Sequence, residues 1–305
     1  MSTVIEVSDL TKAYRTTTAL DDVSLTIEEG TITGLLGRNG AGKTTLMSIL
    51  TAQNFPTRGT VRVFGADPCE NSRVLSRMCF IRENQRYPDD ATARHAISTA
   101  RLFFPRWDEE LAADLVDDFR LPLKTAIKKL SRGQQSAIGV IIGLASRAEV
   151  TFFDEPYLGF DAVARQLFYD RLIADYAEVP RTIVLSSHLI DEVADLLENV
   201  IVLDHGRIIM DEPTETARAR AFTIVGPAEA ADFLTVGREV IHRETLGRVA
   251  SVTVLGTLSP EDREFIAREG LDLTPVSLQQ LIVRRTAGED AVQPPLVQEI
   301  RSRLP

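Results

Sequence analysis

The residues best suited to chemistry form one short loop, Gly37-Arg38-Asn39-Gly40-Ala41-Gly42-Lys43-Thr44, which fits the pattern G-x-x-x-x-G-K-[ST]. The apolar residues 31–36 precede this loop and predict a strand, and residues 45–50 follow it and predict a helix. Glycines let successive backbone N–H groups face one concavity, and the start of the helix directs its own free N–H groups to the same point. The loop therefore predicts a polyphosphate site.

Two side chains of this loop complete the predicted site. The Lys43 ammonium is a mobile point charge suited to β- and γ-phosphates, and the Thr44 hydroxyl is a ligand suited to Mg²⁺. An accidental glycine-rich turn is the alternative, but the position of the loop between a strand and a helix argues against it.

A pair of carboxylates ends a second apolar strand. Residues 150–153 are apolar or β-branched, and Asp154 and Glu155 follow them at the carboxyl end, where ligands gather in parallel α/β sheets. Asp154 is placed to hold Mg²⁺, directly or through water, and Glu155 to accept a proton from an attacking water. A simple helix-capping Asp-Glu pair is the alternative interpretation, and the presence of Lys43 upstream makes it the weaker one.

Only one of the four histidines lies at the tip of a predicted strand. His188 follows the β-branched residues 182–187 beside small hydroxyl side chains, which is the position of a donor to a γ-phosphate. We interpret His95, His205 and His242 as structural or surface residues.

The segment Leu130-Ser131-Arg132-Gly133-Gln134-Gln135 precedes an almost wholly apolar helix at residues 137–145. Its serine and glycine are either a simple helix N-cap or a second phosphate-binding helix end, and taken alone the cap is favoured.

For several aromatic residues the sequence allows both a structural and a functional interpretation. Tyr14, expected in a loop between two strands, either closes a sheet edge or stacks on a flat base. Leu102, Phe103, Phe104 and Trp107 are expected in the core rather than on a docking surface.

Composition limits the class of protein. The chain has 305 residues, 44% of them hydrophobic, which is enough for one large α/β domain and a smaller one. With 34 basic and 44 acidic residues the net charge is −10, and nucleic acid is a poor candidate partner. The longest apolar run, residues 137–145, is less than half of the about twenty residues that span a membrane. Two cysteines and no signal segment predict the cytoplasm.

Taken together, these motifs resemble the ATP-binding cassette (ABC) ATPase, the nucleotide-binding subunit of ABC transporters. The resemblance covers about residues 1–215 and rests on the order of the phosphate loop, LSRGQ, Asp154 with Glu155, Asp161 and His188. It implies a P-loop α/β domain with a helical subdomain at about residues 86–145, and ATP with Mg²⁺ as the bound species.

The resemblance also implies residue roles. Tyr14 would stack on adenine, Asp154 would support Mg²⁺, Glu155 would be the general base, and His188 would contact the γ-phosphate. Asp161 would communicate across a dimer. The residues implied in nucleotide binding are Tyr14, Gly37, Arg38, Asn39, Gly40, Ala41, Gly42, Lys43, Thr44, Thr45, Ser131, Gly133, Gln134 and Asp161; Lys43 joins Glu155 and His188 as catalytic, and Thr44, Asp154 and Glu83 are the implied metal ligands.

Two positions depart from the family pattern. The segment LSRGQ, residues 130–134, corresponds to the signature of the family, and Arg132 stands where the family usually has glycine. Glu83 aligns with the family's glutamine after the strand at residues 79–81. A carboxylate at Glu83 would add negative charge beside the metal. Gln85, two residues later, is the alternative residue for this role.

The single copies of the phosphate loop and of the signature indicate that the chain works with a second subunit. The chain has one phosphate loop, one signature and no internal repeat, whereas the family binds each ATP between the loop of one subunit and the signature of another. A second ABC ATPase subunit, in a homodimer or heterodimer, is therefore implied. So is a separate transmembrane permease, which would hold the chain at the cytoplasmic face of the membrane and which the chain would power, for export rather than import. The helices at residues 91–123 and the Glu83 loop are its expected docking surface.

Two other classes of protein are the alternatives. A soluble ABC-type ATPase acting on ribosomes or DNA typically carries tandem cassettes or basic linkers, which are missing from this sequence. A phosphate-loop GTPase would carry an Asn-Lys-x-Asp motif, which is also missing.

Residues 221–285 predict a separate small α+β unit. Its strands and helices follow in the order βαββαβ, which is typical of a ferredoxin-like two-layer domain. We place this accessory domain at residues 220–286, and residues 287–305, with two adjacent prolines, predict a flexible tail.

Overall fold

The computed structural model describes residues 2–83 and 85–286, and the chain divides into two compact units after Pro213. The predicted tail at residues 287–305 lies outside the described residues. The first unit has two sheets and the second has one, each unit has its own apolar core, and the motifs that predict chemistry all lie in the first unit.

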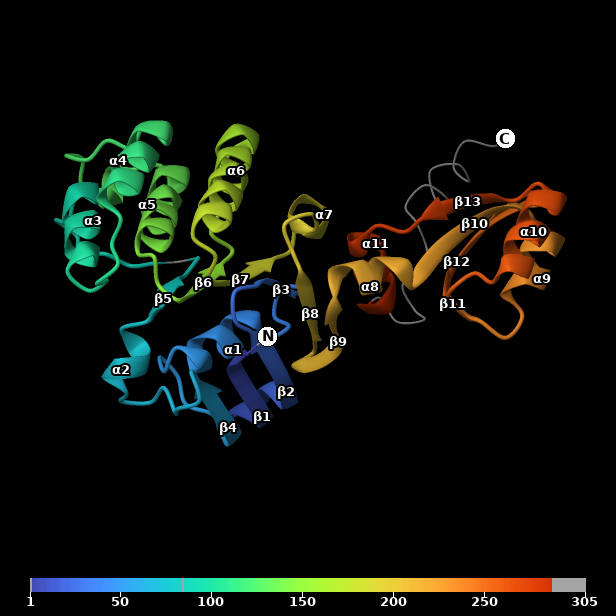
Figure 1. Cartoon of the computed structure of the whole chain (residues 1–305), viewed down its shortest axis with the longest axis horizontal. Coiled ribbons are helices and arrows are strands. Elements are labelled where there is room, and N and C mark those ends of the chain that lie inside the picture. Colours follow the sequence, from blue (N-terminus) through green and yellow to red (C-terminus); the bar gives the residue numbers. More distant parts are fainter. Residues whose placement is uncertain (1, 84, 287–305) are drawn as a thin grey trace. The chain divides into compact units, whose positions relative to one another are not determined.

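A six-stranded sheet forms the centre of the first unit (Figure 1). Its strand order is β5-β6-β7-β3-β8-β9, and all neighbours are parallel except the last pair. Strands β3, β6 and β7 are buried along their whole length, as expected for apolar strands covered on both faces. The strands are β3 Ile32–Leu36, β5 Met78–Ile81, β6 Val150–Asp154, β7 Thr182–Ser187, β8 Asn199–Asp204 and β9 Arg207–Pro213.

A second, antiparallel sheet has the order β2-β1-β4, with β1 Thr3–Tyr14, β2 Thr17–Glu28 and β4 Arg58–Val63. Helix α1 (Lys43–Leu50) shares one buried cluster with this sheet and with β3, β6, β7 and β8 of the larger sheet. The helix that begins at the phosphate loop is therefore packed against both sheets. Tyr14 is the last residue of β1, so its predicted place in a loop was wrong by one position.

Helices α3, α4 and α5 lie together beyond one edge of the large sheet (Figure 1). Asp108 is the N-cap of α4, and its side chain accepts a hydrogen bond from Leu111 N–H at 2.9 Å. Gly139 and Gly143 let α5 lie close to the sheet, because a Cβ at Gly139 would be 2.7 Å from Ile81. The helices of this unit are α1, α2 Ser72–Leu75, α3 Ala93–Arg101, α4 Glu109–Asp118, the 3₁₀ turn η1 Ile127–Lys129, α5 Arg132–Ala145, α6 Ala162–Glu178 and α7 Ile190–Val193.

The aromatic cluster after α3 corrects one expectation. Leu102 and Phe103 are 81% and 69% exposed, so the prediction that these two side chains belong to the core was wrong. They follow the last residue of α3 in a turn, and the part of the chain that the structure describes leaves both side chains exposed. Phe103 and Phe104 instead line an apolar cavity of about 550 Å³ together with Tyr87.

A buried ion network joins the helical region to the sheet. The Arg147 guanidinium lies 2.8 Å from Asp108 at the start of α4 and 2.8 Å from Asp175 on α6. Arg181, just before β7, lies 2.5 Å from the same Asp175. Burial raises the pKa of Asp175, and the two arginines act in the opposite direction. Each buried charge therefore depends on the others for compensation.

The second unit contains a four-stranded sheet in the order β11-β12-β10-β13, with every pair antiparallel. Its elements follow the predicted order βαββαβ, flanked by one helix on each side. Its core includes Phe222, Ile224 and Val252 from the sheet, with Leu234 and Ile266 from the helices. The elements are α8 Thr214–Ala219, β10 Ala221–Pro227, α9 Ala228–Thr235, β11 Glu239–Leu246, β12 Val249–Leu255, α10 Pro260–Glu269, β13 Asp272–Pro275 and α11 Leu278–Thr286.

The ion network predicts that replacing two acidic residues of α6 lowers the free energy of unfolding by different amounts. Asp175→Ala leaves two buried arginines without their shared carboxylate and should lower the free energy of unfolding by about 3–5 kcal/mol. Glu178→Ala is the matched control, because Glu178 faces the same Arg147 at 3.8 Å but is 75% exposed; its cost should be below about 1 kcal/mol. Denaturant unfolding of the full chain measures both, and equal costs would contradict the prediction.

Candidate active site

The phosphate loop joins β3 to α1, and its conformation requires its glycines. Gly37, Gly40 and Gly42 have φ of +142°, +84° and +112°, which other residues rarely adopt. A Cβ at Gly42 would also lie 2.6 Å from the carbonyl oxygen of Ala19. The loop borders a cavity of about 260 Å³, lined in the described part of the chain by Ala19, Asn39, Gly40, Ala41, Gly42, Lys43, Thr44, Thr45, Glu83, Asp154 and Glu155.

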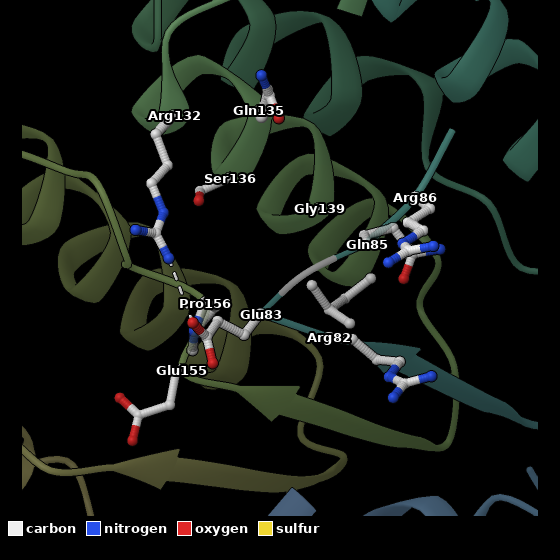
Figure 2. A pocket seen from close by; sticks show the side chains of 11 residues that line it. Arg82, Glu83, Gln85, Arg86, Arg132, Gln135, Ser136, Gly139, Glu155 and Pro156 are labelled. Carbon is white, nitrogen blue, oxygen red and sulfur yellow. Dashed lines mark hydrogen bonds and ion pairs between the residues drawn. The ribbon is translucent and has the colours of Figure 1, made fainter. Parts of the chain in front are cut away.

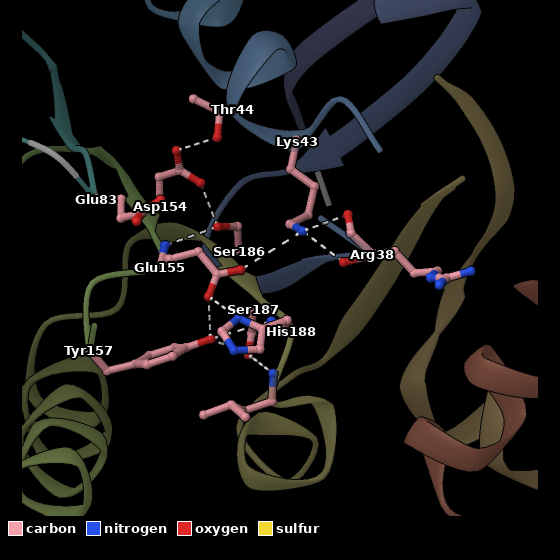
Figure 3. Close-up of polar contacts among 12 residues, drawn as sticks. Arg38, Lys43, Thr44, Glu83, Asp154, Glu155, Tyr157, Ser186, Ser187 and His188 are labelled. Atoms are coloured by element: carbon pink, nitrogen blue, oxygen red, sulfur yellow. Dashed lines mark hydrogen bonds and ion pairs between the residues drawn. The ribbon is translucent and has the colours of Figure 1, made fainter. Parts of the chain in front are cut away.

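Lys43 is the buried cation of this site (Figure 3). Its ammonium donates to the carbonyl oxygens of Gly37 at 2.7 Å and Arg38 at 3.3 Å, and lies 3.8 Å from Glu155 Oε1. Burial lowers the pKa of Lys43, while the carboxylates of Glu155 and Asp154 favour its charged form. The ammonium lies between the loop and the carboxylates, as a group that bridges phosphates and a base must.

Thr44 and Asp154 form an oxygen pair next to Lys43. The Thr44 hydroxyl donates to Asp154 Oδ2 at 2.7 Å, and the Ser186 hydroxyl donates to Oδ1 at 2.7 Å. Asp154 and Ser186 are register partners in the parallel strands β6 and β7. Hydroxyl and carboxylate oxygens are the ligands that Mg²⁺ prefers. Among the described residues no group of three or more His, Cys, Asp or Glu is arranged to hold a metal ion.

Glu155 and His188, predicted separately, are brought into direct contact. Glu155 is 7% exposed, has φ of +49°, and its N–H donates to Ser186 Oγ at 3.0 Å. Its Oε2 lies 2.6 Å from His188 Nδ1. Because an ionised carboxylate only accepts hydrogen bonds, Nδ1 carries the proton in this contact. For Nε2 to donate to a phosphate as well, the ring must be doubly protonated or must turn.

Tyr157 belongs to the same cluster and was missed in the sequence. Its hydroxyl lies 2.6 Å from Glu155 Oε2 and 2.8 Å from Ser187 Oγ, and the side chain is almost fully buried. The available signal was its position two residues after Glu155, at the carboxyl end of β6, where ligand-binding residues collect.

The signature residues lie outside the cavity beside the phosphate loop. Ser131 caps α5 by accepting from Gln134 N–H at 3.2 Å, and the Gln134 side chain accepts from Ser131 N–H at 3.1 Å. A Cβ at Gly133 would lie 2.6 Å from the carbonyl oxygen of Gly159, so only glycine fits there. Asp161 caps α6 through Ala164 N–H at 2.8 Å. None of Ser131, Gly133 and Asp161 is among the described residues that line the cavity around Lys43.

Tyr14 is 46% exposed at the end of β1. Its hydroxyl accepts from the Asn54 amide at 2.7 Å, and Lys12 Nζ lies 4.9 Å from the ring centroid. It does not line the cavity beside the phosphate loop, so its stacking role stays a prediction.

The two departures from the family pattern contact each other. Arg132 lies 3.2 Å from Glu83 Oε1 (Figure 2), on the wall of a second cavity of about 390 Å³. Glu83 lines both this cavity and the one beside the phosphate loop, whereas Gln85 lines this cavity but not the one beside the phosphate loop. Of the two residues, Glu83 is therefore the one that reaches the phosphate-loop cavity.

Comparison with known proteins agrees with this geometry. The model of the ABC transporter family matches residues 20–158. The doxorubicin resistance ATP-binding protein DrrA of Mycobacterium tuberculosis is 30% identical over 251 residues, covering 80% of this chain and 71% of that protein. The bacitracin transport ATP-binding protein BcrA of Enterococcus faecalis is 31% identical over 213 residues, which cover 68% of this chain and 69% of that protein.

Solved structures share the fold of the first unit. An ATP-binding subunit of an ABC transporter superposes with a TM-score of 0.63 at 22% identity, over 70% of this chain and 92% of that one. A bacterial ABC transporter cassette with a dimeric structure superposes with a TM-score of 0.61 at 22% identity, over 69% of this chain and 98% of that one.

The chain therefore belongs to the ABC transporter family as an ATP-binding subunit, and its reaction is ATP hydrolysis coupled to transport. The predicted P-loop α/β fold is confirmed. No helix of the described residues is long and apolar enough to cross a membrane.

The position of Lys43 predicts loss of nucleotide binding when its charge is removed. Lys43→Ala leaves the phosphates without their buried cation, and the affinity for ATP should fall at least about tenfold, since hydrogen bonds to charged groups contribute about 1.5–3 kcal/mol. Lys128→Ala, an exposed lysine of η1, is the control. Isothermal titration calorimetry with ATP measures both, and equal affinities would contradict the placement of Lys43.

Proposed function

We propose that this chain binds Mg·ATP as one of two cassettes and that the closed pair drives a separately encoded permease, for export. The observation that carries the proposal is the cluster of Lys43, Thr44, Asp154, Glu155 and His188 around one cavity edge. A cation, a metal-binding oxygen pair and a base thus lie at the carboxyl ends of adjacent parallel strands.

The proposed chemistry is in-line attack of water on the γ-phosphorus. Glu155 accepts a proton from the water, the water oxygen forms the new bond to phosphorus, and the bond to the β-γ bridging oxygen breaks so that ADP leaves with that electron pair. Lys43 orients the phosphates and His188 holds the base and contacts the γ-phosphate. Thr44 and Asp154 would hold Mg²⁺, which when bound neutralises phosphate charge.

The placement of the signature supports a second subunit. Ser131, Gly133 and Gln134 lie outside the cavity beside the chain's own phosphate loop, so they are available to nucleotide held by a partner. The partner is another ABC ATPase subunit, either a copy of this chain or a related one. Asp161, at the start of α6, is the residue proposed to communicate between the two sites.

An apolar cavity supports docking of a permease. The exposed Leu102 and Phe103 lie next to the 550 Å³ cavity, which Phe80, Tyr87 and Phe104 also line. Relatives named for doxorubicin resistance and bacitracin transport, and the Nod factor export ATP-binding protein I of Sinorhizobium fredii, 31% identical over 213 residues, favour export. The permease would hold the chain at the cytoplasmic face of the membrane.

The domain plan is also part of this proposal. We assign residues 1–215 to the ATPase domain, with its helical subdomain at about 86–145, and residues 220–286 to an accessory domain. The antiparallel order β11-β12-β10-β13, reached through βαββαβ connections, supports a ferredoxin-like fold for the accessory domain.

The role of Glu155 predicts a trapped state. Glu155→Gln keeps the shape of the side chain but accepts no proton, so hydrolysis should fall by at least about 100-fold while ATP binding stays within about twofold. Because ATP then persists, size-exclusion chromatography with Mg·ATP should show a stable dimer. Unimpaired turnover would contradict the assignment of the base. Co-purification of the wild-type chain without any multi-helix membrane protein would instead favour a soluble ATPase.

The position of Glu83 predicts a change in the Mg²⁺ requirement. If Glu83 supports the metal, Glu83→Gln should raise the Mg²⁺ concentration for half-maximal ATPase activity by about 10-fold or more. Gln85→Ala is the comparison, because Gln85 is the alternative residue for this role. A shift in the Gln85 variant alone would transfer the role to Gln85.

A further inference from the structure

The hydroxyl of Tyr157 connects the base to the turn after β7 (Figure 3). It lies 2.6 Å from Glu155 Oε2, 2.8 Å from Ser187 Oγ and 3.3 Å from His188 N. The Tyr157 ring also packs edge-on against Tyr169 of α6, with ring centroids 6.4 Å apart. One hydroxyl therefore contacts three groups from two strand ends.

The direction of these hydrogen bonds follows from what each group can donate. The Glu155 carboxylate only accepts, so Tyr157 gives its single proton to Oε2. Tyr157 must then accept from Ser187 Oγ–H and from His188 N–H. Ser187 accepts in turn from Leu189 N–H at 2.9 Å. The chain of donors runs one way, from the backbone turn after β7 to the carboxylate, and such chains polarise each member.

The tyrosine remains a donor throughout the working range of pH. Burial, with the nearby Glu155 carboxylate, raises the pKa of Tyr157 far above its usual value. The hydroxyl thus holds its proton while the base gains and loses one.

The contacts distinguish the two oxygens of Glu155. Oε2 is held by Tyr157 and by His188 Nδ1, both at 2.6 Å. Oε1 lies 3.8 Å from the Lys43 ammonium and has no hydrogen-bond partner among the described residues. The buried oxygen that remains open to a proton is therefore the one that faces the cation of the phosphate loop.

We propose that Tyr157 is a positioning residue for ATP hydrolysis, which fixes Glu155 by Oε2 so that Oε1 takes the proton of the attacking water. This inference rests on the proposed role of Glu155 as the base. The proton moves from water to Oε1 as the water oxygen bonds to the γ-phosphorus and ADP departs, and Tyr157 keeps its own proton throughout. The same hydroxyl links the base to the backbone of His188, so both residues keep one relative position.

The test is Tyr157→Phe, which removes one oxygen and keeps the buried ring. In the purified full chain we expect kcat for ATP to fall about tenfold, the size of one hydrogen bond to a charged group, with KM and ATP affinity within about twofold. Tyr169→Phe is the matched control, because Tyr169 is a neighbouring buried tyrosine whose hydroxyl has no hydrogen-bond partner among the described residues; its kcat should equal that of the wild type. Ser187→Ala, which breaks the donor chain one step earlier, should give a smaller fall in kcat.

A double variant separates positioning from simple packing. In single-turnover experiments Tyr157→Phe should cause no further loss in the Glu155→Gln background, because a residue that acts through Glu155 has nothing left to position. An equal additional loss in that background, a weakened ATP affinity, or a wild-type kcat for Tyr157→Phe would overturn the inference. Normal turnover of Glu155→Gln alone would instead remove the proposed function, whatever Tyr157 does. If Tyr157→Phe unfolds, the Ser187→Ala result decides.

Discussion

The site depends on one buried charge arrangement, the Lys43 ammonium between backbone carbonyls and the carboxylates of Glu155 and Asp154. A cation with so little exposure to water is stable only where fixed oxygens surround it. The first unit supplies them by packing α1 between two sheets and by ending β6 at Asp154, next to the phosphate loop. The carboxylates that favour the charged form of the ammonium also line the cavity beside the phosphate loop.

Sequence motifs predicted the parts of this arrangement that are local. The strand and helix on either side of the phosphate loop and the buried strands before Glu155 and His188 depend on neighbouring residues, and each was found where the pattern indicated. Contacts between distant segments were not visible in the same way. Tyr157 belongs to no motif, and its contacts with Ser187 and His188 arise because β7 lies beside β6. The exposed Leu102 and Phe103 were assigned to the core because apolar character alone does not show which neighbours are present.

The pairing of Arg132 with Glu83 shows how two unusual residues depend on each other. A carboxylate beside the phosphates is unfavourable by itself, because it adds to their negative charge. Arg132 at 3.2 Å offsets that charge. Since the side chains are 64% and 35% exposed, the contact contributes little to folding. Under the proposed function, its effect concerns the electrostatic potential beside the phosphate loop. The charge of Glu83 and the charge of Arg132 therefore have to be considered together.

Helix α5 lies so close to the sheet that Gly139 and Gly143 have room only for hydrogen, with Ile81 and Phe153 directly opposite. Neither glycine belongs to a motif, yet both set how near α5, which Ser131 caps, packs to the strands β5 and β6. A Cβ at either glycine would clash with these side chains, so a substitution there must shift the helix or the strand residues opposite. The geometry around the phosphate loop can thus be altered from positions that do not line its cavity.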